Sequence, residues 1–213
     1  MEVTSKKAPD AKERILIATL KVIKEKGMRG VRHRAVAAEA GVSLGSTTYH
    51  FKDIEDLISS TFIYWHENQD VGENPHFISI SEDVENLIKT KTDKQVFIEK
   101  LLEDCDKFFK DQVFEKEDER LIELAFHNEA LRNEKLSALL LSSWKREIIR
   151  LVNLFQILGT DEPESDAEVT FALIMQLEKR AMLIKDTEEQ RVACERMGQV
   201  LKRHILMLVK DVI

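Results

Sequence analysis

Residues 30–57 constrain the fold of this 213-residue chain more than any other segment, and their sequence is GVRHRAVAAEAGVSLGSTTYHFKDIEDL. An alanine-rich stretch from Ala35 to Ala40 predicts a short, narrow helix against which a second helix can pack closely. Gly41 follows, and glycine ends helices well because it adopts the left-handed conformation without a Cβ clash. Ser43 then predicts the N-cap of a second short helix. This pattern is that of a helix-turn-helix.

The second of these helices carries small and hydrogen-bonding side chains, which suit a surface that approaches phosphates and base edges closely. Thr47 and Phe51 share the opposite face and are predicted to lie in the core. On or beside this helix, the residues predicted to contact DNA are Ser43, Leu44, Gly45, Ser46, Thr48, Tyr49, His50 and Lys52. A solvated or structural role is the alternative for the polar ones, and the helix-turn-helix context favours DNA contact. Arg32, His33 and Arg34, just before or within the preceding helix, complete the predicted set.

Residues 11–60 resemble the DNA-binding domain of TetR-family transcriptional regulators. The resemblance rests on a leading helix, AKERILIATLKVIKEKG, on the AGVS turn, and on the YHFK ending followed by EDL. It implies an all-α protein, with an N-terminal three-helix helix-turn-helix domain joined to a larger helical domain for ligand binding and dimerisation. It also implies a homodimer, double-stranded DNA as a partner, and repression relieved by a small molecule. Arg34 falls where some members place a base-contacting arginine, and a phosphate contact is the alternative.

Two positions depart from the pattern of the family. Many members have a tyrosine where this chain has Thr48, and many have a lysine where this chain has Ile54. The contacts of those members therefore do not transfer to these two positions. Lys52 is the nearest cation that can replace the lysine.

The net charge of −7 is unevenly distributed along the chain. Residues 1–52 hold 11 Lys and Arg against 5 Asp and Glu, a net charge of +6, so the remainder carries −13. A basic N-terminal part can bind phosphates while an acidic body repels DNA. Chance variation of surface charge is the alternative explanation, and charge alone does not decide between them.

Composition favours an all-α protein, because the chain has only 3 Pro and 7 Gly. The 2 cysteines are far apart and lack metal-ligand spacing, which favours a reducing, cytoplasmic location. No apolar run is long enough to cross a bilayer, so no membrane partner is expected. We find no nucleophile elbow, phosphate-binding loop or dinucleotide motif. The expectation is a protein that is not an enzyme and that needs neither metal nor cofactor.

The predicted organisation is a flexible N-terminus at 1–9, a DNA-binding domain at 10–53 and a regulatory and dimerisation domain at 54–213. Gly72 and Pro75 predict a hinge at 69–80. The helices predicted outside the helix-turn-helix span residues 10–27, 54–68, 82–90, 93–110, 117–132, 134–158, 165–184 and 188–210. The helices at 134–158 and 165–184 carry more apolar positions than one core face requires, which predicts the dimer interface there.

A ligand cavity is expected between the helices at 93–110, 117–132, 134–158 and 165–184, because a small-molecule site is mostly apolar with few polar groups. Core packing is the alternative for each candidate residue. The predicted lining residues are Phe97, Leu101, Cys105, Phe108, Phe126, His127, Trp144, Phe171, Met175 and Glu178. The predicted effector is an unidentified small molecule that is partly hydrophobic.

The favoured hypothesis is a ligand-responsive, sequence-specific transcriptional regulator, most simply a repressor that binds a palindromic operator as a dimer. A first alternative keeps DNA binding but replaces the small molecule with a protein partner of the body. A second alternative is an all-α enzyme with an incidental helix-turn-helix, which requires clustered ionisable groups in a cleft.

Overall fold

The computed structural model describes residues 9–68 and 91–210, and within these ranges the chain forms helices without β-strands. The elements in chain order are α1 (Ala11–Lys26), η1 (Met28–Gly30), α2 (His33–Ala40), α3 (Leu44–His50), α4 (Ile54–Asn68), α6 (Lys91–Lys110), η2 (Asp111–Glu115), α7 (Glu117–Ala130), α8 (Glu134–Leu158), α9 (Pro163–Leu183) and α10 (Thr187–Val209). The all-α fold class is confirmed. Residues 1–8 of the predicted flexible terminus, the predicted hinge at 69–80 and the predicted helix at 82–90 lie outside the described residues.

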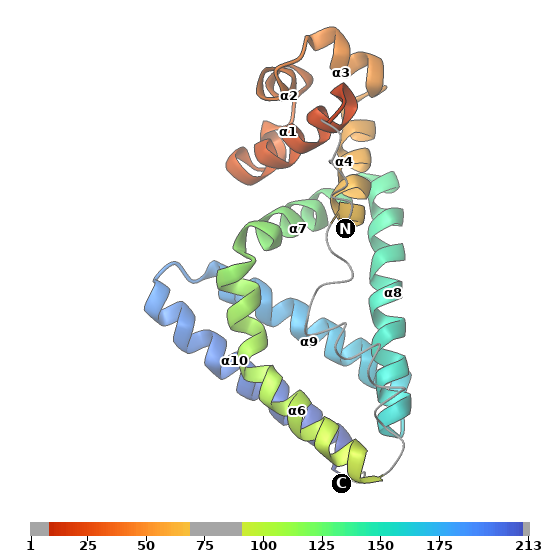
Figure 1. The fold of residues 1–213 in the computed structure, drawn as a ribbon, viewed down its shortest axis with the longest axis vertical. Coiled ribbons are helices and arrows are strands. Elements are labelled where there is room, and N and C mark those ends of the chain that lie inside the picture. The colour runs from red at the N-terminus through yellow and green to blue at the C-terminus, as the bar shows by residue number, and fades with distance from the viewer. Residues whose placement is uncertain (1–8, 69–90, 211–213) are drawn as a thin grey trace, which may run out of the picture. The chain divides into compact units, whose positions relative to one another are not determined.

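The chain forms two compact units, Met1–Gln69 with Leu121–Leu140, and Asp70–Arg120 with Leu141–Ile213. In the first unit α1 packs against α2, α3 and α4 (Figure 1). The apolar stripe of α1, which includes Ile15 and Val22, is buried against this small core. In this division α4 belongs with α1 to α3, and the domain boundary proposed between residues 53 and 54 stays a prediction.

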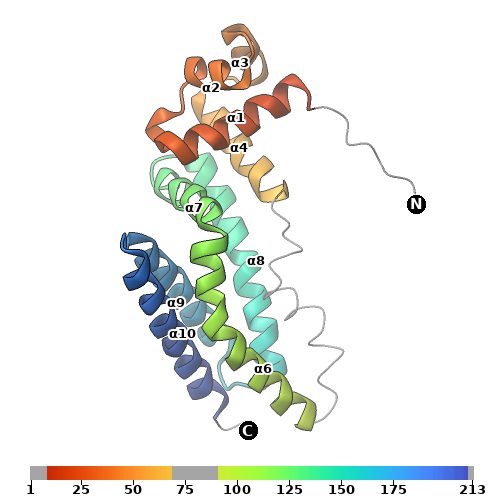
Figure 2. The same cartoon turned by 60° about the vertical axis from the view of Figure 1, so that its left-hand side comes forward.

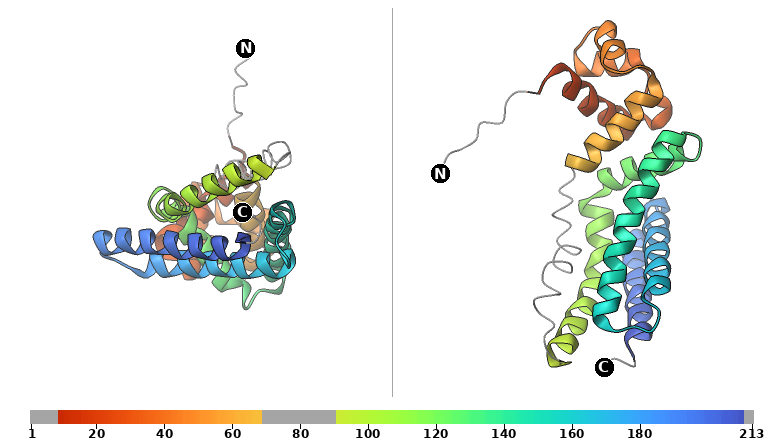
Figure 3. Two further views of the ribbon diagram at one scale, coloured as in Figure 1. Left: turned by 90° about the horizontal axis from the view of Figure 1, so that it is seen from below. Right: turned by 90° about the vertical axis from the view of Figure 1, so that its right-hand side faces the viewer.

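The second unit is built on α10, which packs along α6 and α9 (Figure 2). Helices α9 and α10 run side by side (Figure 3). Apolar residues recur along both helices at helical spacing and so form one stripe on each helix. Each helix buries this stripe against its neighbours. Fully buried side chains of this core include Phe109, Phe155 and Leu158.

Most predicted helix boundaries lie close to those in the structure, and α4 and α8 have the predicted limits. Helix α9 differs, because it begins at Pro163 and not at residue 165. Proline fits the first turn of a helix, where its missing N–H has no partner to lose. The sequence also did not indicate the π-helical turn Asp111–Glu115 between α6 and α7.

Candidate nucleic-acid interface and apolar cavity

One glycine sets the turn between α2 and α3. Gly41 has φ 62° and ψ 37°, a left-handed conformation that residues with a Cβ rarely adopt. Its N–H donates to the carbonyl oxygen of Ala38 at 3.3 Å, and the N–H of Val42 donates to that of Ala37 at 3.0 Å. These hydrogen bonds end α2 and lead the chain into α3 after two residues.

Helix α3 is anchored at its start and along one face. The Oγ of Ser43 accepts a hydrogen bond from the N–H of Ser46 at 3.1 Å, which confirms the predicted N-cap. Thr47 is fully buried, and its hydroxyl donates to the carbonyl oxygen of Leu44 at 2.8 Å. Phe51, directly after the helix, is buried as well. The predicted core face of α3 is therefore confirmed, and the opposite face is held outward.

The outward face of α3 carries the predicted recognition residues. Tyr49 is 84% exposed and Leu44 is 45% exposed. The hydroxyl of Thr48 lies 3.2 Å from the carbonyl oxygen of Gly45, and the ring of His50 meets that of Tyr49 edge-on at 5.1 Å between centroids. This face carries the phenol of Tyr49, the alkyl side chain of Leu44 and, in the first turn, the small residues Gly45 and Ser46. A short helix with such a face can enter a major groove.

The predicted basic contacts lie in the same unit. Arg32 is the N-cap residue of α2, Arg34 lies in its first turn, and both side chains are exposed. Lys52 is exposed directly after α3. His33 differs from these three, because it is half-buried and its Nδ1 is buried without a hydrogen-bond partner among the described residues. His33 is thus the least accessible of these four predicted contacts.

Asp56 forms hydrogen bonds that fix the backbone at Lys52 and Asp53. The backbone N–H of Asp56 donates to Oδ1 of Asp53 at 2.8 Å, and Oδ2 of Asp56 accepts from the backbone N–H of Lys52 at 3.2 Å. The Asp53 carboxylate thereby caps the start of α4. Lys135 at the start of α8 donates from Nζ to Oδ1 of Asp56 at 2.8 Å. The hydrogen bond from Lys135 is the main reason why the pKa of the Asp56 carboxyl lies below its usual value.

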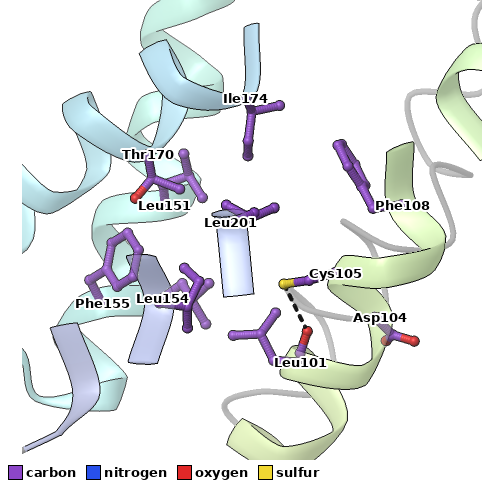
Figure 4. Close-up of a pocket in the computed structure, with 11 residues that line it drawn as sticks. Leu101, Asp104, Cys105, Phe108, Leu151, Leu154, Phe155, Thr170, Ile174 and Leu201 are labelled. Atoms are coloured by element: carbon purple, nitrogen blue, oxygen red, sulfur yellow. Dashed lines mark hydrogen bonds between the residues drawn. The ribbon is translucent and has the colours of Figure 1, made fainter. Parts of the chain in front are cut away.

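The second unit contains an apolar cavity between α6, α8, α9 and α10 (Figure 4). Its empty volume is about 530 Å³, which includes space open to solvent. A space lined by apolar side chains with few polar groups has the character of a small-molecule site. The lining residues are Leu101, Asp104, Cys105, Phe108, Leu151, Leu154, Phe155, Thr170, Ile174, Leu201 and Ile205. Helix α10 forms a wall, whereas the sequence suggested that the helix at 117–132 would do so.

Three of the predicted ligand residues, Leu101, Cys105 and Phe108, line this cavity on α6. Phe126 packs elsewhere, in the first unit, at 5.2 Å between ring centroids from Phe62 and at 5.7 Å from Trp65. His127, the next residue, lies in the same unit, and its Nε2 is 3.6 Å from Oε1 of Glu123 on the preceding turn.

The remaining predicted ligand residues belong to the second unit but are not among those that line this cavity. Glu178 is buried and pairs with Arg120, whose Nη1 lies 3.7 Å from its Oε2. The rings of Trp144 and Phe171 meet at 5.9 Å between centroids. Phe97 is buried on α6, and Met175 is half-buried on α9. A role for these residues in ligand binding stays a prediction.

Thr170 and His204 form a polar pair behind the cavity wall. The Thr170 hydroxyl donates to the carbonyl oxygen of Asp166 at 2.7 Å and lies 2.9 Å from Nε2 of His204. A hydroxyl has one hydrogen and a carbonyl oxygen only accepts, so Nε2–H of His204 donates to Thr170. Burial lowers the pKa of His204, while the charge of Asp166 opposes this effect.

We expect the stability of the protein to fall as the pH drops below about 6.5, the ordinary pKa of histidine. Since the folded state lowers the pKa of His204, the unfolded chain binds the proton more readily and acid favours unfolding. In a His204→Gln variant, which keeps an N–H donor but does not titrate, the decrease in urea midpoint between neutral and mildly acidic pH should be smaller. An equal decrease in both proteins would contradict this role of His204.

Residues 9–68 and 91–210 contain no group of three or more His, Cys, Asp or Glu that could hold a metal ion. In the same ranges, no helix combines the length and the apolar character needed to cross a membrane.

Comparison with known proteins assigns the helix-turn-helix unit. Residues 15–61 match the family model described as bacterial regulatory proteins, tetR family. The chain is 30% identical over 110 residues to the HTH-type transcriptional regulator CymR from Pseudomonas putida, across 52% of this chain and 49% of CymR. Residues 15–61 therefore carry a DNA-binding domain of the TetR family. The match spans about half the length of this curated relative.

Solved structures extend the resemblance from the helix-turn-helix unit to the overall fold. The multidrug binding protein EbrR, in complex with malachite green, has a TM-score of 0.62 at 23% identity, over 92% of this chain and 98% of EbrR. SCO1917, a member of the TetR family from Streptomyces coelicolor A3, has a TM-score of 0.61 at 22% identity, over 92% of this chain and 98% of that chain. At these identities the likeness concerns the fold alone.

Proposed function

We propose that this TetR-family chain is a one-component transcriptional regulator that binds an operator through α3 and is released by a small molecule. The observation that carries DNA binding is the outward face of α3, where Tyr49 is 84% exposed while Thr47 is fully buried. An exposed aromatic residue on a helix that is anchored by Ser43 and Gly41 has no role in the core. It is therefore available to contact the DNA backbone.

The cavity between α6, α8, α9 and α10 supports control by a small molecule. A regulator whose body binds only a protein partner needs no such space, so the cavity favours the ligand-responsive hypothesis over that alternative. EbrR is described as a multidrug binding protein and is seen with malachite green, so this fold accommodates small organic molecules in at least one relative. A ligand lowers DNA affinity only to the extent that it prefers the arrangement that does not bind DNA.

Dimerisation through the second unit is part of the proposal. Helix α8 exposes Leu141 and Ile149, and α9 exposes Val169 and Leu183, each at 47% or more. Exposed apolar side chains of this kind mark protein interfaces when they gather on one surface. A two-fold dimer presents two α3 helices, which implies an operator with inverted half-sites in successive major grooves. The proposed role is repression in the cytoplasm, without catalysis.

The test is a gel shift of the full chain on the DNA upstream of its own coding sequence, with light scattering on the same sample. We expect a retarded band that excess scrambled DNA does not compete away, protection of an inverted repeat, and a mass of about twice 24.6 kDa. Equal competition by scrambled DNA would contradict operator recognition, and a monomer at micromolar concentration would contradict the dimer.

A further inference from the structure

The wall of the cavity is formed almost entirely by hydrocarbon side chains. Helix α8 contributes Leu151, Leu154 and Phe155, and Ile174 and Leu201 approach from α9 and α10 (Figure 4). These residues come from three helices of one unit, so apolar side chains face the space from several directions and not from one helix alone. A ligand in it exchanges water for hydrocarbon on several sides.

The polar groups of the lining residues are occupied or point elsewhere. The thiol of Cys105 donates to the carbonyl oxygen of Leu101 at 3.3 Å. The Thr170 hydroxyl is engaged by Asp166 and His204, and in Figure 4 it points away from Cys105 and Phe108. None of these groups leaves a hydrogen-bond donor free to orient a polar ligand.

Charged groups are also scarce in the described lining of the cavity. Among the described residues that line it, Asp104 is the one with a charged side chain, and its carboxylate points away from Cys105 (Figure 4). Burial lowers the pKa of His204 behind the wall, which favours the neutral imidazole at neutral pH. A charged ligand would therefore lose its hydration without meeting a counter-charge, and this exchange is unfavourable.

We propose that the cavity binds an uncharged, hydrocarbon-rich molecule, such as a substituted arene, without a fixed hydrogen bond and without an ionic anchor. The proposal rests on the proposed function for its regulatory consequence, since binding in this cavity would be the signal that releases DNA. The site then discriminates against charged compounds. A charged analogue of the ligand binds more weakly, because its charged group loses hydration in the cavity.

The test uses three compounds that share one ring system and differ in charge: methylnaphthalene, naphthoate and naphthylmethylammonium. Each displaces the neutral fluorescent probe N-phenylnaphthylamine from the purified full chain. We expect methylnaphthalene to compete at a concentration at least about tenfold lower than either ion. Equal competition by the three compounds, or stronger competition by an ion, would overturn the proposal.

Two variants locate the binding. Ile174→Phe and Leu201→Phe place extra volume in the cavity from different helices and should each weaken probe binding by at least about fivefold. Gln176→Phe is the matched control, because Gln176 is exposed on the same helix as Ile174 and does not line the cavity. Circular dichroism identifies any variant that fails to fold. Probe binding that persists in a folded Ile174→Phe or Leu201→Phe variant would place the ligand elsewhere and refute the assignment.

The same compounds separate this proposal from the proposed function. If methylnaphthalene binds in the cavity but leaves the operator complex intact, the ligand class stands and ligand-controlled DNA binding is wrong. If naphthoate or naphthylmethylammonium releases the operator while methylnaphthalene does not, control by a ligand stands and the uncharged ligand class is wrong.

Discussion

Replacement of Lys52 by alanine is expected to weaken DNA binding by about tenfold on every sequence and to reduce the dependence of affinity on salt. Lys52 is exposed beside α3, and a lysine that neutralises one phosphate contributes about 0.9 to the slope of log affinity against log salt. Tyr49→Ala should also weaken binding on all sequences, because we propose that the 84% exposed phenol contacts the DNA backbone.

The measurement is fluorescence anisotropy on operator and scrambled duplexes at several salt concentrations. Lys179→Ala is the matched control, since Lys179 is an exposed lysine on α9 in the other unit and should leave affinity and slope unchanged. If Lys52→Ala or Tyr49→Ala changes only the preference between base sequences, the backbone role assigned to that residue is wrong.

Local chemistry explains why the helix-turn-helix could be predicted residue by residue. Gly41 and Ser43 act through hydrogen bonds that reach three or four residues along the chain, and both occupy their predicted places. The boundaries of α8 were predictable for the same reason. Gly159 has φ 80° just after α8, and the apolar stripe keeps helical spacing up to Leu158.

The lining of the cavity depends on contacts that sequence spacing does not encode. An apolar stripe predicts that a helix face is buried, but it does not identify the partner helix. Leu101, Cys105 and Phe108 share one face of α6 and were found together for that reason. The contribution of Leu201 and Ile205 was missed, because it requires the knowledge that α10 packs along α6.

Buried charge is also ambiguous in a sequence. Glu178 interrupts an apolar face, which suggests either a ligand contact or an ion pair, and the structure places Arg120 at 3.7 Å from it. Arg120 belongs to a different helix, 58 positions earlier in the chain, so no local pattern connects the two residues. The π-helical turn that precedes α7 is a further feature without a distinctive sequence signature.

Phe126→Ala is expected to lower the free energy of unfolding of the first unit by about 3–5 kcal/mol, which is the usual cost of deleting a buried phenylalanine ring. Phe126 is fully buried and contacts the rings of Phe62 and Trp65 on α4, so the substitution leaves a cavity between α7 and α4. Leu131→Ala serves as the control, because Leu131 lies in the same unit and is 88% exposed, and its loss should change stability by less than about 0.5 kcal/mol.

Urea unfolding followed by tryptophan fluorescence measures this loss in the unit itself. The chain has 2 tryptophans, so a Trp144→Phe background leaves Trp65, which adjoins Phe126, as the reporter. Because α7 carries Phe126 and α4 carries both of its ring partners, the same substitution should loosen the support of α3. DNA affinity should then fall although no predicted contact residue is altered. A Phe126→Ala variant with the stability of the Leu131→Ala control would show that α7 does not complete the core of the DNA-binding unit.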